Sequence, residues 1–338
     1  MIKKINFTGY FPTFDYRLSD VYKILSKNFE VEISDNPDYI FCGCYDNYDF
    51  CNNSHAIRIM YTFEYYLPNF NVLDYAINCF SNISFEDRST MFHSCLYHFI
   101  NYEKRNNCTR EELKQKNAFC NMIYSHNGYL DRDYYFNLIS TYKRVDSAGA
   151  FMNNMNGFTP GPRHGGDAGI FRDHRQKVQF QSKYKFSMAF ENAYAPYYWT
   201  EKIIHAYLAK TIPIYRGDKR VFETLNKKCC IYADEMTDKQ LLARIREIDQ
   251  NDDLFLSIVN EPLFNDPDFV SKSYKRLEEF LMYIFTQDLE HARRRSKVIP
   301  LELENLRLGK FQKVKNNKYK FYIFRLLSGR INKTASQK

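Results

Sequence analysis

The sequence predicts an α/β protein built from two Rossmann-like domains that face one cleft. Two observations predict this fold. Short apolar runs alternate with helical patterns along the chain, and the alternation restarts after a charged stretch at residues 101–117. The length of 338 residues suits two domains of ordinary size. We therefore expect an N-terminal domain over residues 1–117, a C-terminal domain over residues 118–290 and a basic, aromatic tail over residues 291–338.

The expected strands are short runs of apolar, β-branched and aromatic residues. In the first domain we expect strands at residues 4–8, 30–33, 39–42, 57–61 and 75–77, with a helix around residues 21–25. In the second domain we expect strands at residues 119–124, 186–190, 212–215 and 229–232, with helices at residues 132–142 and 200–209. Between these elements, residues 157–169 contain five glycines and two prolines, which predicts a mobile lid or an insertion.

The composition excludes a disordered chain and indicates a cytoplasmic protein. Hydrophobic residues make up 44% of the chain and aromatic residues 17%, which is enough to bury substantial cores. Only a few apolar residues precede Thr8 and Gly9, which is too few for a signal peptide or a spanning helix. The nine cysteines have no regular spacing, so we expect reduced thiols.

The positive charge is concentrated at the C-terminal end. Residues 292–338 contain 14 Lys or Arg but only two Asp or Glu, so the rest of the chain is close to neutral. A basic and aromatic tail of this kind suits an anionic membrane surface, which would make the protein peripheral on a membrane, or it is an ordinary terminal helix. A nucleic-acid-binding protein is an alternative class, but the tail alone supports it and no recognised binding motif accompanies the tail. We therefore expect no nucleic-acid partner.

The stretch from Lys185 to Arg216 is predicted to place a strand end, a loop and a helix start together. Open α/β sheets bind ligands at such a place, where free N–H groups and the helix dipole attract phosphate. We expect Thr200 to cap the helix, Lys202 to add a positive charge, and Glu201 to bind hydroxyls such as a ribose diol. Local physics also fits a simple alternative, a well-capped amphipathic helix without a ligand.

This stretch resembles the donor-site signature of the α1,3/4-fucosyltransferases, glycosyltransferase family 10, in their bacterial form. The resemblance covers about residues 1–285. The matching motifs are Tyr184-Lys185-Phe186, Phe190-Glu191-Asn192, Tyr198, Thr200-Glu201-Lys202, Ile212-Pro213-Ile214-Tyr215 and Arg216-Gly217, with SHNGYLDR at 125–132, YKRVDSAGAFMNN at 142–154, YTFE at 61–64 and PNFNVLDYAI at 68–77.

The resemblance implies the GT-B fold and the transfer of L-fucose from GDP-β-L-fucose with inversion. It implies an acceptor hydroxyl on a GlcNAc or glucose residue of a glycan such as N-acetyllactosamine, with an α1,3 linkage favoured over α1,4. It implies no cofactor and no metal site, because arginine can hold a diphosphate by two hydrogen bonds. A transferase that uses another GDP-sugar is the alternative within the same class.

The resemblance also assigns roles to individual residues. Glu64 corresponds to the catalytic base, which removes the proton of the acceptor hydroxyl. Glu191 and Lys185 are assigned supporting roles, and Glu191 is expected to orient its loop. The donor-binding residues that the resemblance implies are Arg132, Asn192, Tyr198, Glu201, Lys202 and Ser125.

Four positions depart from the pattern of the family. Phe63 stands where the family has glycine before the base, and Tyr65 stands where it has asparagine. Both lie on the acceptor side, so they are expected to narrow or reshape that pocket. Trp199 replaces a valine before the Thr-Glu-Lys motif, and Arg216 replaces a hydrophobic residue before Gly217. The donor is therefore predicted more firmly than the acceptor.

Overall fold

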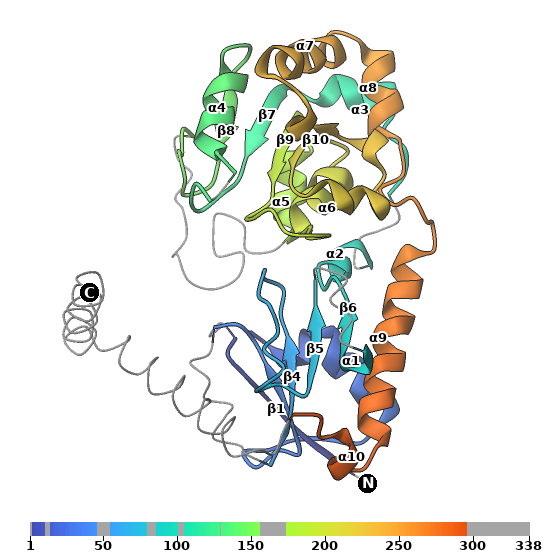
Figure 1. Ribbon diagram of the computed structural model, residues 1–338. Helices are drawn as coiled ribbons and strands as arrows, with labels where there is room; N and C mark the ends of the chain where they lie inside the picture. The colour runs from blue at the N-terminus through green and yellow to red at the C-terminus, as the bar shows by residue number, and fades with distance from the viewer. Residues whose placement is uncertain are drawn as a thin grey trace, which may run out of the picture.

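The computed structural model describes residues 2–10, 14–45, 55–79, 86–100, 105–128, 130–155 and 174–295 (Figure 1). The glycine-rich stretch at residues 157–169 and the tail from residue 296 onward lie outside the described residues. The prediction of a lid or insertion, and the prediction for most of the tail, therefore cannot be compared with the structure.

The first unit is a six-stranded sheet in which every described pair of neighbouring strands is parallel. The strand order is β2-β1-β3-β4-β5-β6. The strands are β1 (Lys3–Thr8), β2 (Val31–Ile33), β3 (Tyr39–Cys42), β4 (Ile57–Tyr61), β5 (Tyr75–Asn78) and β6 (Ser89–Met91). Two helices of this unit are α1 (Asp20–Asn28) and α2 (Leu96–Ile100). Helix α1 begins after Ser19, whose hydroxyl accepts a hydrogen bond from the Tyr22 N–H at 3.2 Å.

The second unit is a five-stranded parallel sheet with the order β11-β10-β9-β7-β8. Its strands are β7 (Ala118–Met122), β8 (Val145–Ser147), β9 (Tyr184–Phe190), β10 (Ile212–Arg216) and β11 (Ile231–Tyr232). Its helices are α3 (Arg110–Gln115), α4 (Arg132–Ser140), α5 (His174–Gln181), α6 (Glu201–Leu208), α7 (Asp238–Asp249) and α8 (Asp252–Val259). Strands with helices between them confirm the predicted α/β class.

The strand order of the second sheet defines where a ligand can bind. From β7 the chain moves outward to β8, and it then returns to the other side of β7 to form β9. The loops that follow β7 and β9 therefore leave the sheet in opposite directions. Open α/β sheets bind ligands in the crevice that forms at this switch point.

Two contacts join the loops of the two units. The His93 ring, which follows β6, stacks on the Trp199 ring at 4.1 Å with an interplanar angle of 14°. The Tyr65 ring, which follows β4, lies 6.1 Å from the Tyr198 ring. Tyr65 and His93 follow the carboxyl ends of β4 and β6 in the first sheet, and their partners follow the carboxyl end of β9 in the second sheet. The carboxyl ends of the two sheets therefore face each other.

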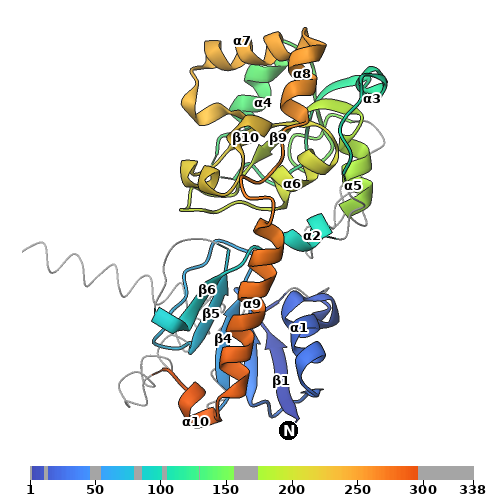
Figure 2. The same cartoon turned by 90° about the vertical axis from the view of Figure 1, so that its right-hand side faces the viewer.

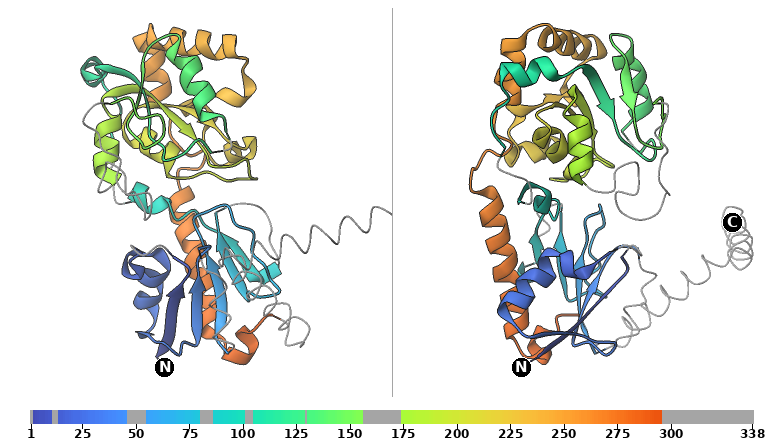
Figure 3. Two further views of the ribbon diagram at one scale, coloured as in Figure 1. Left: turned by 90° about the vertical axis from the view of Figure 1, so that its left-hand side faces the viewer. Right: turned by 180° about the vertical axis from the view of Figure 1, so that it is seen from behind.

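The chain returns to the first unit before it ends (Figure 2). Helix α9 (Phe269–Thr286) lies along the first sheet, and the short helix α10 (Leu289–Ala292) follows it there, as the views in Figure 3 also show. The Phe285 ring stacks on Tyr39 at 4.1 Å, and the Tyr274 hydroxyl donates to Asp20 Oδ1 at 2.8 Å. This placement differs from the expected range of the C-terminal domain, residues 118–290. An amphipathic pattern predicts a buried face of a helix but not the sheet that covers this face.

Several predicted elements agree closely with the structure. The bounds of β3 and β4 are those expected, and β9 is two residues longer at its start. In the described part of the chain, all eight cysteines are free thiols. Across the same residues, none of the helices combines the length and the hydrophobicity that a membrane span requires.

Candidate active site

Arg132 connects the loops that follow β7 and β9. It is the first residue of α4 and is only 1% exposed. Its Nη2 donates to the side-chain oxygen of Asn192 at 2.9 Å and to the Glu191 carbonyl at 3.0 Å, while Nη1 donates to the His126 carbonyl at 3.0 Å. The guanidinium also lies 3.8 Å from the centre of the Tyr124 ring. One buried cation therefore fixes both loops of the switch point.

Glu191 holds the two ends of the loop after β9 together. Its fully buried carboxylate accepts hydrogen bonds from the Thr200 N–H at 3.0 Å and from the Thr200 hydroxyl at 2.6 Å. Thr200 occupies the N-cap position of α6, as expected, but its hydroxyl binds Glu191 and makes no capping bond to the helix. Burial raises the pKa of Glu191 to about 7, although Lys202 and the Thr200 hydrogen bonds act in the opposite direction.

The ammonium group of Lys202 lies between the carboxylates of Glu191 and Glu201. Its Nζ donates to the Thr200 hydroxyl oxygen at 3.0 Å and lies 3.4 Å from Glu201 Oε1 and 3.8 Å from Glu191 Oε2. Burial alone would lower the pKa of Lys202, but the charges of Glu201 and Glu191 outweigh it and raise this pKa above the ordinary value. The side chain, only 12% exposed, is therefore a permanent cation at the start of α6.

Two buried polar atoms in these loops have no hydrogen-bond partner within the described residues. They are Nε of Arg132 and the hydroxyl of Tyr198, and Tyr198 is only 1% exposed. A buried polar atom without a partner costs about 1–3 kcal/mol. Two such unpaired groups therefore lie in the loops that follow β7 and β9.

Glu64 lies in the first unit, just beyond the carboxyl end of β4, and is partly exposed. The Tyr45 hydroxyl donates to its Oε1 at 3.0 Å, and its own N–H donates to the Thr62 hydroxyl oxygen at 3.2 Å. The negative charge of Glu64 acts to raise the pKa of two side chains in the second unit. Burial lowers the pKa of His126, and Glu64 opposes this effect. Burial raises the pKa of Tyr198, and Glu64 adds to this effect. The ring of the next residue, Tyr65, lies 6.1 Å from the Tyr198 ring, so this loop adjoins the loop after β9.

The other predicted residues divide between the two ends of the second sheet. Glu201 is the first residue of α6, and Ser125 lies exposed in the loop after β7. Lys185 lies near the opposite, amino end of β9, where its Nζ donates to the Asp249 carbonyl at 2.8 Å and lies 3.2 Å from Asp249 Oδ1. The structure thus brings the predicted donor residues together at the carboxyl edge and separates Lys185 from them.

Sequence reasoning did not assign a site role to Arg216 or to Tyr45. Arg216 ends β10 and contacts three loops: its Nε donates to Asp234 at 2.6 Å, Nη2 to the Tyr194 hydroxyl at 2.7 Å and Nη1 to the Leu130 carbonyl at 2.7 Å. The sequence feature that could have identified Arg216 is a charged arginine at the end of an otherwise apolar, buried strand. No local pattern signals Tyr45, because its contact with Glu64 joins two separate loops.

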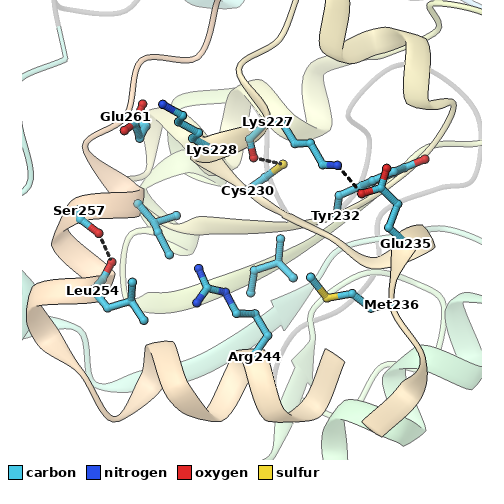
Figure 4. A pocket seen from close by; sticks show the side chains of 12 residues that line it. Lys227, Lys228, Cys230, Tyr232, Glu235, Met236, Arg244, Leu254, Ser257 and Glu261 are labelled. Carbon is cyan, nitrogen blue, oxygen red and sulfur yellow. Dashed lines mark hydrogen bonds and ion pairs between the residues drawn. The ribbon is translucent and has the colours of Figure 1, made fainter. Parts of the chain in front are cut away.

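A cavity of about 360 Å³ lies outside these loops, at β11 and the helices α7 and α8 (Figure 4). Its charged side chains include Lys227, which pairs with Glu235, and Arg244, which pairs with Glu247 at 2.7 Å. None of the predicted site residues lines it. Throughout the described ranges, no three His, Cys, Asp or Glu side chains gather in an arrangement that could hold a metal ion.

The two facing parallel sheets define a GT-B glycosyltransferase fold. The family model described as glycosyltransferase family 10 (fucosyltransferase), C-terminal part, matches residues 79–260, and that of the N-terminal domain of α-(1,3)-fucosyltransferase FucT matches residues 5–100. The chain therefore belongs to glycosyltransferase family 10, as its motifs predicted.

Known relatives are similar over most of this chain. A putative fucosyltransferase R654 of Acanthamoeba polyphaga mimivirus is 32% identical over 255 residues, which cover 72% of this chain and 41% of the relative. The α-(1,3)-fucosyltransferase FucT of Helicobacter pylori is 25% identical over 304 residues, which cover 81% of this chain and 63% of the relative. The chain thus spans less than two thirds of the length of each of these relatives.

Solved structures show the same fold. A crystal structure of an α1,3-fucosyltransferase with GDP is 24% identical, with a TM-score of 0.67, and the match covers 85% of this chain and 91% of that one. The crystal structure of an α1,3-fucosyltransferase with GDP-fucose is 22% identical, with a TM-score of 0.62, and the match covers 82% of this chain and 90% of that one. These likenesses confirm the predicted two-unit α/β fold.

Proposed function

We propose that this protein transfers L-fucose from GDP-β-L-fucose to a hydroxyl of a GlcNAc or glucose residue in a glycan such as N-acetyllactosamine. We expect inversion and an α1,3 linkage. The family supports the donor. The single observation that carries the proposal is the convergence of Arg132, Asn192, Tyr198 and Lys202 at the switch point of the second sheet, beside the loop that carries Glu64.

The proposed reaction is one displacement at the anomeric carbon of fucose. Glu64 takes the proton of the acceptor hydroxyl, whose oxygen forms the new bond to that carbon. The bond from the carbon to the β-phosphate oxygen breaks, and GDP leaves with the electron pair. Negative charge grows on the diphosphate during this step, so the cations of Lys202 and Arg132 stabilise the transition state.

The remaining residues fit binding of the nucleotide. Glu201 is proposed to accept hydrogen bonds from the ribose hydroxyls, and Asn192, Tyr198 and Ser125 to contact the donor. Two cations at the start of α4 and α6 can hold a diphosphate without a divalent ion. We therefore propose a reaction that requires neither a metal nor another cofactor.

The test is GDP release from GDP-fucose in the presence of an array of glycan acceptors, with EDTA in the buffer. We expect release that depends on the acceptor, together with a fucosylated product. A parallel assay with GDP-mannose tests the alternative of another GDP-sugar. Equal turnover of both donors would contradict the choice of fucose, and complete loss of activity in EDTA would contradict the reaction without a metal.

We also propose that the protein is cytoplasmic and that residues 292–338 bind an anionic membrane surface. Three of the 14 basic residues in this segment, Arg293, Arg294 and Arg295, bind groups of the first unit. The other 11, from residue 296 onward, support the proposal, because each Lys or Arg close to an anionic bilayer contributes about 1 kcal/mol. Co-sedimentation with phosphatidylserine vesicles is expected for the full chain and not for a chain that ends at residue 295. Equal sedimentation of both would exclude the tail as the anchor.

A further inference from the structure

A buried stack of two rings joins the first unit to the loop that follows β9. The His93 ring, just beyond β6, stacks on the Trp199 ring at 4.1 Å, and the two residues are only 2% and 1% exposed. The pattern of the family has a valine where this chain has Trp199, and a valine offers no ring for such a stack. The contact is therefore not part of the family pattern.

His93 also holds the main chain two residues before Trp199. Its Nε2 lies 3.3 Å from the carbonyl oxygen of Tyr197, and since a carbonyl can only accept, Nε2 carries the hydrogen. Burial lowers the pKa of His93 to about 4, so the ring is neutral at neutral pH. The two contacts of His93 thus lie on either side of Tyr198.

The main chain at Tyr197 has a conformation that needs support. Its φ angle of 62° lies in the left-handed region, which a bulky residue rarely adopts. Such a conformation persists only where the surroundings hold it, and it is concentrated at functional sites. His93 holds the carbonyl of Tyr197, and the Tyr197 hydroxyl donates to Glu223 at 3.3 Å. The strained residue directly precedes Tyr198, whose hydroxyl has no partner within the described residues.

Trp199 also lies against the segment through which the chain returns to the first unit. Its ring is 5.9 Å from the Phe264 ring and 6.3 Å from the ring of Phe269, the first residue of α9. Trp199 therefore contacts the first unit through His93 and also contacts the connection between the two units. A shift of one unit against the other would move the main chain beside Tyr198.

We infer that His93 is a positioning residue of the donor site, which acts from the first unit through Tyr197 and Trp199. This inference rests on the proposed function. His93 fixes the segment before α6, and this segment sets where the Tyr198 hydroxyl and the ammonium group of Lys202 lie. The affinity for the donor therefore depends on the contact between the two units, and by thermodynamic reciprocity the donor strengthens this contact.

Calorimetry with GDP measures the role of His93. We expect His93→Ala to raise the Kd for GDP by about tenfold, because both contacts are lost. His93→Phe keeps a ring that stacks on Trp199, and His93→Gln keeps an N–H group that can reach the Tyr197 carbonyl. Each should raise the Kd by only about two- to fivefold. A Kd of His93→Ala within about twofold of wild type would overturn the inference.

Phe92→Leu is the matched control for a loss of packing. Phe92 directly precedes His93, is also 2% exposed, and its ring packs edge-on against the Tyr274 ring at 5.1 Å. The substitution should lower the free energy of unfolding and leave the Kd for GDP unchanged. Equal increases in Kd for Phe92→Leu and His93→Ala would show that His93 acts only through stability, which would also overturn the inference.

Trp199 is the only tryptophan of the chain, so its fluorescence reports this contact directly. We expect GDP to reduce the quenching of Trp199 by acrylamide in the wild type, because the donor strengthens the contact. Without GDP, quenching should be stronger in His93→Ala than in the wild type. The inference fails if the wild type binds GDP by calorimetry and the quenching does not change. If the wild type does not bind GDP at all, the proposed function fails, and the inference fails with it.

Discussion

The loops of the second unit that are proposed to bind the donor and the loop that carries Glu64 in the first unit are built in opposite ways. Arg132 and Glu191 are buried and hydrogen-bonded to the main chain, so each donor group is held in place by the fold. Glu64 is partly exposed among exposed rings, and one tyrosine hydroxyl contacts its carboxylate. The difference indicates that substitutions in the donor loops cost stability and donor affinity together, whereas substitutions around Glu64 cost turnover alone.

The largest effect is expected for Glu64→Gln. The amide cannot take the proton of the acceptor, so kcat should fall by about 10²- to 10⁴-fold. The free energy of unfolding should change by less than about 0.5 kcal/mol, because the side chain is partly exposed. The binding of GDP should be unchanged. Initial rates, urea unfolding and calorimetry with GDP check these three expectations.

Glu32→Gln is the matched control, since Glu32 is an exposed glutamate on β2 of the same unit. It should retain wild-type turnover. If Glu64→Gln keeps more than a tenth of the wild-type kcat, Glu64 is not the base. If it instead weakens the binding of GDP, the separation between donor side and acceptor side breaks down.

Lys202→Met should affect stability and donor binding together. The substitution removes the cation beside Glu191, and breaking a buried ion pair costs about 3–5 kcal/mol. The loss of stability should be smaller at pH 6 than at pH 8, because Glu191, with a pKa of about 7, can take up a proton. The Kd for GDP should rise by about 10- to 100-fold, as for a lost hydrogen bond to a charged group.

Lys228→Met serves as the control for the loss of a positive charge, since Lys228 is exposed in the same unit. Its Kd for GDP and its unfolding free energy should match the wild type. A pH-independent destabilisation of Lys202→Met would contradict the coupling between Lys202 and Glu191.

The pH dependence of stability gives a separate test of Glu191. Burial raises its folded pKa to about 7, above the ordinary value of a glutamate. The neutral carboxyl therefore contributes stability that is fully present at low pH, and this contribution is lost as the pH rises through about 7. Glu191→Gln stays neutral at every pH, so its stability relative to wild type should increase by about 2–3 kcal/mol between pH 5 and pH 8.

Urea unfolding of both proteins at the two pH values measures this difference. Other groups also titrate in this pH range. Burial raises the pKa of Asp20, for example, to about 6. The comparison with wild type cancels their contribution, because both proteins contain them. A stability difference that is the same at pH 5 and at pH 8 would show that Glu191 stays ionised in the folded protein.

The sequence was sufficient for elements whose signal is local. Strands β3 and β4 are buried along their whole length, so β3 appears as a continuous apolar run and β4 as a run that only Arg58 interrupts. Helix α9 was not among the expected elements, and its residues were included in the range of the C-terminal domain. Its apolar stripe of Leu277, Leu281 and Ile284 fits any apolar surface. Only the folded chain shows that this surface belongs to the first sheet.

The distinction between local sequence signals and contacts that only the folded chain makes also applies to the candidate site. Asn192 and Lys202 lie in one strand-loop-helix segment, so their spacing predicted that they share an edge of the sheet. The contacts of Arg216 with Asp234 and Leu130 join loops that follow different strands. Glu191 was expected to orient its loop, but its bond to Thr200 was hidden, because a threonine before a helix is an ordinary cap unless a buried carboxylate competes for its hydroxyl.

The smallest effect is expected for Lys185→Met. Lys185 lies near the amino end of β9, whereas Lys202 lies in α6, beyond the loop at the carboxyl end of β9. Lys185 contacts Asp249, and Asp249 keeps two other partners after the substitution, Lys143 at 2.5 Å and the Tyr142 hydroxyl at 2.9 Å. No buried charge is left alone, so the loss of stability should be only about 0.5–1.5 kcal/mol.

The Kd for GDP and kcat/KM of Lys185→Met should stay within about twofold of wild type, because the amino end of β9 lies away from the loops that hold Arg132. Calorimetry with GDP, run side by side on Lys185→Met and Lys202→Met, is the decisive measurement. Equal weakening of GDP binding in the two variants would mean that the lysines act through the stability of the sheet. A loss confined to Lys202→Met would assign donor binding to the carboxyl edge.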